Sequence, residues 1–206
     1  PEPRHLALAV LAALECGDAG AAHERSARGL VLHPDDPDVL EAALRERLAA
    51  GDPAGALGLA ERRLVLRPQD PKSLRLRARA RLAAGDQAAA QADLDSALAK
   101  AEAWSPFGGD VGRERAQALA DLGECHLRRD RLQEATLAAR RAVAACRTIP
   151  GPHRVLARTL CRQGDGESAR KELAEALQIG TDPIDSVLAS AEVEAQLIPD
   201  PRPQAQ

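Results

Sequence analysis

A short turn marker recurs through this sequence at a fixed interval of 34 residues. The markers begin at Gly17, Gly51, Gly85, Asp130 and Gly164. The spacing between the third and fourth markers is 45, which is one interval plus 11 residues. Self-similarity at a period of about 20 to 50 residues is the signature of repeat architectures. The sequence therefore predicts a chain of similar supersecondary units.

Each interval has the pattern of two helices joined by a tight turn. Glycine suits the end of the first helix because it adopts left-handed backbone angles without steric cost. Five residues after each marker stands a small residue where the two helices must approach closely, namely Ala22, Ala56, Ala90, Ala135 and Ala169. Seven residues further on stands Gly29, Arg63 or an alanine, and Pro34 and Pro68 follow the second helices of the first two intervals.

A 34-residue hairpin of this kind resembles the tetratricopeptide repeat, and the segment from Leu122-Gly123 to Ala135 is the best single match. The resemblance covers residues 3–183. It implies an all-α fold, a right-handed α-solenoid of antiparallel helical hairpins. The expected repeats are 3–36, 37–70, 71–104, 116–149 and 150–183, with an insertion at 105–115.

Beyond the last repeat, residues 184–197 predict a capping helix, since a solenoid needs a terminal helix with a polar outer face. The Pro-rich tail 198–206 is expected to be disordered, so the solenoid spans residues 1–197. Arg77 and Arg81 depart from the family pattern, as does Arg47, because these positions are usually apolar. Either these arginines pair with acids of a neighbouring helix, or the first helices are rotated from their usual setting.

Composition agrees with helices and excludes several function classes. Apolar residues are nearly all Ala, Leu and Val, which suit closely packed helices. The net charge of −3 disfavours a nucleic-acid binder. No apolar run approaches the roughly 20 residues that span a bilayer. The absence of Asn and the excess of Arg over Lys indicate a GC-rich, bacterial genome. The chain does not begin with Met, so we interpret its N-terminus as processed or truncated.

Motifs for catalysis are missing, and we predict neither an enzyme nor a cofactor. The sequence contains no HExxH, GxSxG or GxxxxGK[ST] pattern. The four cysteines form no CxxC pair, which argues against a disulfide framework or a structural zinc site. Cys125, His126 and Cys161 lie on first helices of adjacent repeats, so a metal site or a Cys-His nucleophile is the minor alternative to plain core packing. The segment 108–112 is read as a flexible connector.

By resemblance, the first helices line a concave groove that binds a partner. Positions 2, 5, 9, 12 and 13 of each repeat face it, and nine of these 25 residues are basic against four acidic. The residues we expect to contact a partner are Arg45, Lys72, Arg75, Arg79, Leu82, Leu127, Arg128, Arg154, Arg158 and Arg162. Arginine would bind a carboxylate through its planar fork. The bland alternative is a set of Arg-rich, solvated helices.

Two further features bear on the partner. The clamp by which some tetratricopeptide proteins hold the carboxylate of chaperone C-termini uses paired Asn residues, and this sequence contains none. Trp104 and Phe107, the only aromatic residues, flank and occupy the insertion. They either pack over the joint between repeats three and four or anchor a partner.

We therefore predict a protein–protein interaction scaffold or adaptor whose groove prefers an acidic segment of another protein. The alternatives are an accessory domain of a larger enzyme, of the glycosyl- or sulfotransferase type, and a periplasmic factor of envelope or cytochrome assembly. Four unpaired cysteines favour the cytoplasm slightly over the periplasm. We predict neither a nucleic-acid partner nor a membrane-spanning segment in this chain.

Overall fold

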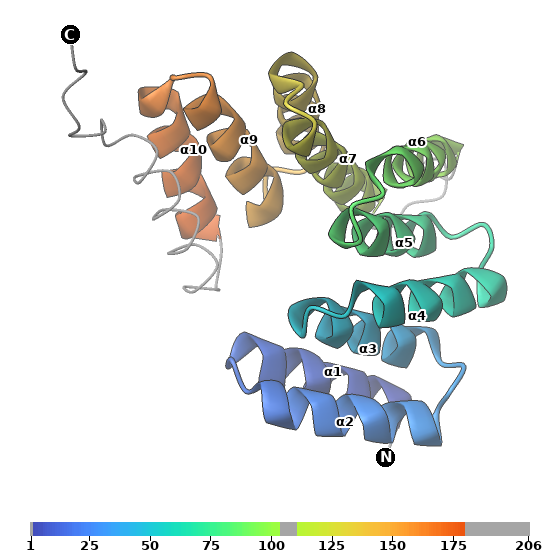
Figure 1. Cartoon of the computed structure of the whole chain (residues 1–206). Coiled ribbons are helices and arrows are strands. Elements are labelled where there is room, and N and C mark those ends of the chain that lie inside the picture. Colours follow the sequence, from blue (N-terminus) through green and yellow to red (C-terminus); the bar gives the residue numbers. More distant parts are fainter. Residues whose placement is uncertain (1, 104–110, 180–206) are drawn as a thin grey trace, which may run out of the picture. The chain divides into compact units, whose positions relative to one another are not determined.

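The computed structural model describes residues 2–103 and 111–179 and divides the chain into two compact units, 1–114 and 115–206, each described here by itself (Figure 1). The described part contains helices and no strand. The N-terminal unit holds α1 (Pro3–Glu15), α2 (Ala19–Leu32), α3 (Pro37–Ala49), α4 (Pro53–Leu66), α5 (Pro71–Ala83) and α6 (Gln87–Ala103). The C-terminal unit holds most of α7 (Val111–Arg128), then α8 (Leu132–Ala145), α9 (Pro150–Arg162) and α10 (Gly166–Ile179).

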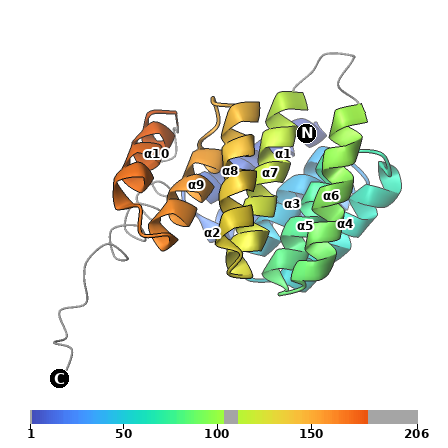
Figure 2. The same cartoon turned by 90° about the horizontal axis from the view of Figure 1, so that it is seen from above.

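Consecutive helices pair as antiparallel hairpins, and each hairpin packs on the next within its unit. Figures 1 and 2 show α5 beside α6 and α9 beside α10. In the N-terminal unit α1 also packs on α3, and α4 packs on α5. The prediction of an all-α solenoid built from helical hairpins is thereby confirmed for the described helices.

The turn glycines adopt the backbone conformation that the pattern requires. Gly17, Gly51, Gly85 and Gly164 have φ between 71° and 85°, in the left-handed region that disfavours side chains. Asp130 stands at the same place in repeat four and has φ of 58°. This residue also ends the first helix of its hairpin, and Asp is among the few side chains that adopt left-handed backbone angles.

Proline and aspartate set the starts of the first helices. Proline occupies the first helical position of α1, α3, α5 and α9, where its missing N–H costs no hydrogen bond. Asp36 accepts hydrogen bonds from the backbone N–H groups of Asp38 and Val39, and Asp70 accepts one from Lys72. These carboxylates satisfy donors that would otherwise be orphaned at the helix N-terminus.

The alanines predicted to mark close helix contacts are all fully buried. Ala22, Ala56, Ala90, Ala135 and Ala169 each have 0% of their surface exposed. The second small position is equally tight: a Cβ added to Gly29 would lie 3.1 Å from Cγ1 of Val39, on the next helix. Arg63 occupies that position in repeat two and is buried as well.

The core runs from one repeat into the next rather than ending at the repeat boundaries. One cluster joins three successive helices through Leu44 of α3, Ala56 and Ala60 of α4, and Leu76 and Ala80 of α5. Another joins α8, α9 and α10 through Ala139, Leu156, Leu160 and Leu173. Because no repeat buries its apolar surface alone, stability depends on neighbours, as expected of a solenoid.

Helix α7 begins inside the segment that we predicted to be an insertion. Residues 111–115, which we assigned to the insertion, form the first turn and more of α7, so Gly112 lies in a helix and not in a connector. The run Arg113-Glu114-Arg115 consists of good helix formers, which outweigh the single glycine. Residues 104–110, the predicted capping helix 184–197 and the tail 198–206 lie outside the described residues.

The backbone at Asp130 generates a stability prediction. Asp130→Gly and Asp130→Ala both remove the carboxylate, but only glycine adopts φ of 58° without strain. We expect the glycine variant to be more stable than the alanine variant by about 1 kcal/mol. For a chain of this size that is a difference of about 2–4 °C in melting temperature.

Thermal unfolding followed by circular dichroism measures this difference. Equal melting temperatures for the two variants would contradict the assignment of a strained turn at this position.

Candidate functional site

The first-helix face of the N-terminal unit is made by α1, α3 and α5, and its predicted basic residues differ in accessibility. The side chains of Arg45 and Lys72 are 37% and 31% exposed. Arg79 is exposed and forms no ion pair with the described residues. Arg75 and Leu82 are buried, so they support this face from beneath and offer a partner little surface.

A buried carboxylate lies between two of these cations. One oxygen of Glu41 accepts a hydrogen bond from Arg45 Nη2 at 2.7 Å, and the other lies 2.6 Å from Lys72 Nζ. Burial would raise the pKa of Glu41, but the hydrogen bond from Lys72 and the charges of Arg45, Lys72 and Arg63 hold it below its usual value. Glu41 therefore stays ionised and ties α3 to α5, and it offsets part of the positive charge that the sequence suggested.

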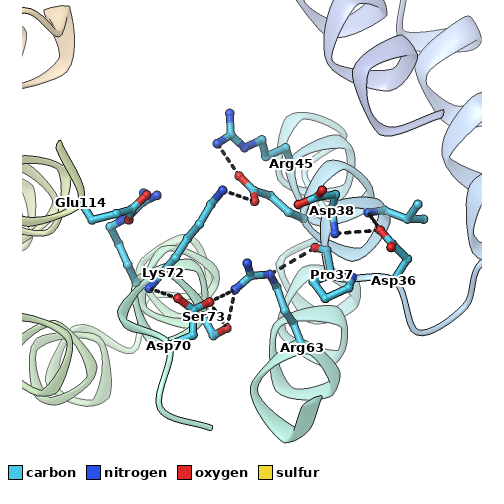
Figure 3. A network of polar contacts seen from close by, with 12 residues as sticks. Asp36, Pro37, Asp38, Arg45, Arg63, Asp70, Lys72, Ser73 and Glu114 are labelled. Atoms are coloured by element: carbon cyan, nitrogen blue, oxygen red, sulfur yellow. Dashed lines mark hydrogen bonds and ion pairs between the residues drawn. The ribbon is translucent and has the colours of Figure 1, made fainter. Parts of the chain in front are cut away.

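A second network lies below this face and is centred on Arg63 of α4 (Figure 3). Its guanidinium donates to the backbone carbonyl of Pro37 at 3.2 Å, to Asp70 Oδ2 at 2.6 Å and to the hydroxyl of Ser73. Burial opposes the ionisation of Asp70, but hydrogen bonds from Ser73 and Arg63 keep its pKa below the usual range. Because Arg63 is only 2% exposed, this arginine has a structural role.

The arginines at usually apolar positions find acids on neighbouring helices, which resolves the question that the sequence left open. Arg77 binds both oxygens of Asp93 on α6, at 2.9 and 2.6 Å, and Arg81 lies 2.8 Å from the same carboxylate. Asp93 is 4% exposed. Arg75 pairs similarly with Glu114 at 3.2 Å, within the N-terminal unit. Arg47 lies 3.5 Å from Asp52.

The first-helix face of the C-terminal unit carries a stripe of arginines along α9. Arg154, Arg158 and Arg162 follow one another at intervals of four residues, which places them on one side of a helix. We call these three residues the α9 stripe. Arg154 is half-buried, whereas the side chains of Arg158 and Arg162 are 37% and 41% exposed.

Carboxylates of α7 and of the turn that follows it contact this stripe. Glu124 of α7 accepts from Arg158 Nη1 at 2.8 Å and from Arg128 Nε at 3.1 Å, so two guanidinium groups share one carboxylate. Arg162 donates to the backbone carbonyl of Leu127 and lies 2.8 Å from the exposed carboxylate of Asp130. Leu127 itself is buried. At the predicted groove positions of repeats four and five, the sequence places four arginines and one glutamate.

The sequence analysis did not predict most of these acidic partners, although the spacing of two of them indicates an ion pair within one helix. Glu41 and Glu124 stand four residues before Arg45 and Arg128, the spacing of a helical ion pair. The contacts of Glu124 with Arg158 and of Glu41 with Lys72 join different repeats and depend on how hairpins stack. Glu114 was hidden because the insertion was not read as helix.

All four cysteines lie within the described residues and are unbridged thiols. Cys125 and Cys161 are buried, and burial raises the pKa of the Cys161 thiol, which keeps it protonated and weakly nucleophilic. No group of three potential metal ligands occurs in residues 2–103 and 111–179. None of the described helices combines the length and apolarity that crossing a bilayer requires. Trp104 and Phe107 lie outside the described residues.

Comparison with known proteins identifies solved structures that are similar to this fold. No protein-family model matches the sequence, and no curated protein matches it. Among solved structures, the chain is similar to TTC0263, a thermophilic TPR protein of Thermus thermophilus, with 20% identity, coverage of 94% of this chain and 97% of that chain, and a TM-score of 0.69.

It is also similar to PilW, described as a widely conserved type IV pilus biogenesis factor, with 16% identity, coverage of 95% of this chain and 86% of that chain, and a TM-score of 0.66. The yeast protein Tom70 matches with 14% identity, coverage of 91% of this chain and 38% of that chain, and a TM-score of 0.63. At these identities the likeness concerns the fold, and it confirms the predicted tetratricopeptide-type solenoid.

The Asp93 network generates a stability prediction. Repeat two carries Ala43 and Leu59 where repeat three carries Arg77 and Asp93. We expect Asp93→Leu alone to destabilise the protein by about 3 kcal/mol, because it leaves two arginines without their buried carboxylate. Adding Arg77→Ala should recover most of that loss, since the pair then reproduces the apolar packing of repeat two. Urea unfolding of both variants measures the effect, and a double variant no more stable than Asp93→Leu would contradict it.

The lowered pKa of Glu41 generates a pH prediction. A depressed carboxyl pKa stabilises the folded state fully above the usual glutamate pKa of about 4.3 and loses that effect as pH falls through the folded pKa. We expect Glu41→Gln to cost about 1.5–3 kcal/mol at neutral pH, the range of a hydrogen bond to a charged group.

This difference from the unsubstituted protein should shrink as the pH falls below the usual glutamate pKa of about 4.3 and through the lower pKa of Glu41, because the protonated carboxyl then carries no charge, like the amide of Gln. Chemical unfolding at a series of pH values measures it. A difference that stays constant between neutral and acid pH would contradict the assignment.

Proposed function

We propose that this protein is an interaction scaffold that binds an acidic segment of another protein across the α9 stripe. The observation that carries the proposal is the run of Arg154, Arg158 and Arg162 along one side of α9, where Arg158 and Arg162 are partly exposed. Arginine binds carboxylates through two parallel N–H donors, which favours an acidic partner.

The face of the N-terminal unit supports the same function less strongly. Glu41 offsets Arg45 and Lys72, Glu114 offsets the buried Arg75, and the acids Glu15 and Asp38 stand at predicted groove positions. Arg79 keeps an unshared charge on this face. We therefore propose that the face of the N-terminal unit extends the contact with the partner. The preference for acidic partners is assigned to the C-terminal unit.

The fold favours binding over chemistry. Similar solved structures carry the tetratricopeptide fold, whose stacked hairpins present a continuous surface formed by several repeats. The titratable groups Glu41 and Asp70, whose pKa is lowered, are engaged in ion pairs and a helix cap within the protein. A protein partner is the ligand class that suits such a surface.

A selection from a random peptide library displayed on phage, carried out with the full chain, tests the proposal. We expect the enriched peptides to be rich in Asp and Glu and to bind more weakly as salt rises. Replacing Arg158 and Arg162 with Gln should weaken their binding about 10-fold, since each exposed ion pair contributes up to about 1 kcal/mol.

The matched control replaces Arg141 and Arg147 with Gln. Both are exposed, on and just after α8 and off the α9 stripe, and the net charge changes equally. Enriched peptides without acidic character, or equal losses in the two double variants, would overturn the proposal.

A further inference from the structure

One side of α1 is exposed where the same positions of the next two first helices are buried. His5, Leu8 and Ala12 follow one another at spacings of three and four residues, which places them on one side of the helix. Leu8 is 55% exposed, the side chain of His5 is 71% exposed, and Ala12 is exposed as well. We call these three residues the α1 end surface. The corresponding residues of the next two repeats are at most 3% exposed, and they are Val39, Ala42 and Glu46 in α3 and Ser73, Leu76 and Ala80 in α5.

In the later repeats, the second helix of the preceding repeat covers these positions. Gly29 of α2 faces Val39, and a Cβ added to it would lie 3.1 Å from Cγ1 of that valine. Nδ1 of His23, also on α2, lies 3.0 Å from Oε1 of Glu46. Helix α4 packs on α5 in the same way. The α1 end surface is thus built like a surface on which another helix docks, and none of the described helices covers it.

The charges of α1 make this surface complementary to itself. Arg4 and His5 stand at the start of the helix, and Glu15, three residues after Ala12, stands at its end. When two copies of α1 pack antiparallel about a two-fold axis, His5 lies beside Glu15 of the second copy. Leu8 then lies beside Ala12 of the second copy. The midpoints of both pairs fall at residue 10, so a single arrangement brings opposite charges together and sets a large side chain against a small one.

The charged groups at the two ends of α1 are open to a second copy. Arg4 and Glu15 are exposed, and Arg4 forms no ion pair with the described residues. His5 lies 3.9 Å from the carboxylate of Glu2, whose side chain is 78% exposed. Such a solvated contact contributes little, so it does not compete strongly with a carboxylate brought in by another chain.

We propose that the α1 end surface is the contact through which two copies of this chain form a symmetric, antiparallel dimer. A two-fold contact uses the same patch on both copies, so it requires a patch that complements itself. The inference goes beyond the proposed function, because the α9 stripe takes no part in it. A contact made by one helix of each copy belongs to the small interfaces, below about 1,200 Å², that bind weakly, so we expect dimers at about 100 μM and monomers at about 1 μM.

Sedimentation equilibrium of the full chain at these two concentrations measures the dimerisation. Leu8→Glu should lower the association constant more than about 10-fold, because it places a charge without a partner at the apolar centre of the contact. The matched control is Val65→Glu, which changes the net charge equally at a residue of α4 that is 80% exposed. This control should leave the association constant unchanged.

Two charge variants test the antiparallel register. One chain carries Glu15→Arg, and the other carries Arg4→Glu together with His5→Glu. Each variant alone should be monomeric at about 100 μM, because like charges then face one another at both ends of the contact. An equimolar mixture should dimerise, since the basic surface of one variant then meets the acidic surface of the other.

Three outcomes would overturn the inference. An unsubstituted chain that stays monomeric at about 100 μM does not associate through α1. A dimer that Val65→Glu weakens as much as Leu8→Glu is held by another surface. A mixture of the charge variants that stays monomeric excludes the antiparallel contact of two α1 helices. Melting temperatures close to that of the unsubstituted chain confirm that the variants are folded, as expected for substitutions at exposed side chains.

Discussion

The close contact of two helices at a buried alanine is the constraint on which the rest of this structure depends. It recurs in every repeat, at Ala22, Ala56, Ala90, Ala135 and Ala169. A methyl group there allows the helices to pack at the short end of the usual interaxial distance of about 8–10 Å. The buried apolar residues of the described part are mostly Ala and Leu, with no Phe, Tyr or Trp among them. Polar side chains therefore take over part of the packing, and buried arginines become structural elements.

These arginines divide into two classes that look alike in the sequence. In α5, residues 75, 77, 79 and 81 are all arginine, at alternate positions. Successive residues of a helix turn by about 100°, so 77 and 81 point towards α6 and meet Asp93, whereas 79 reaches the surface. Charge alone does not identify a binding residue in such a protein. What separates the classes in α5 is whether the other helix of the same hairpin supplies a buried carboxylate.

The period of the markers was sufficient to predict the fold, because turn glycines, close-contact alanines and helix-starting prolines act locally. The prediction that Arg77 and Arg81 pair with acids remained one of two alternatives, since it depends on which face of α6 meets α5. The residues of the first-helix faces were predicted from their positions within each repeat, by resemblance to the family. Their burial, as at Arg75 and Leu127, depends on how hairpins stack, and helix 111–128 began earlier than its glycine-rich start indicated. Tertiary contacts between distant segments account for the pairing and the burial, whereas the earlier start of α7 follows from the local helix propensity of Arg113, Glu114 and Arg115.

The junctions between repeats also restrict how such a chain can evolve. Gly29 faces Val39, and one interval later Arg63 faces Ser73. At the first junction the small residue belongs to the second helix of the earlier repeat, and at the next junction it belongs to the first helix of the later repeat. A tandem copy of 37–70 would bring Arg63 against Val39, where no hydroxyl receives its guanidinium. Moving 71–104 next to Gly29 would leave Ser73 opposite a missing side chain. The order of the first three repeats is therefore fixed by paired substitutions, and duplication or shuffling of single repeats would need compensating changes on both sides of the junction.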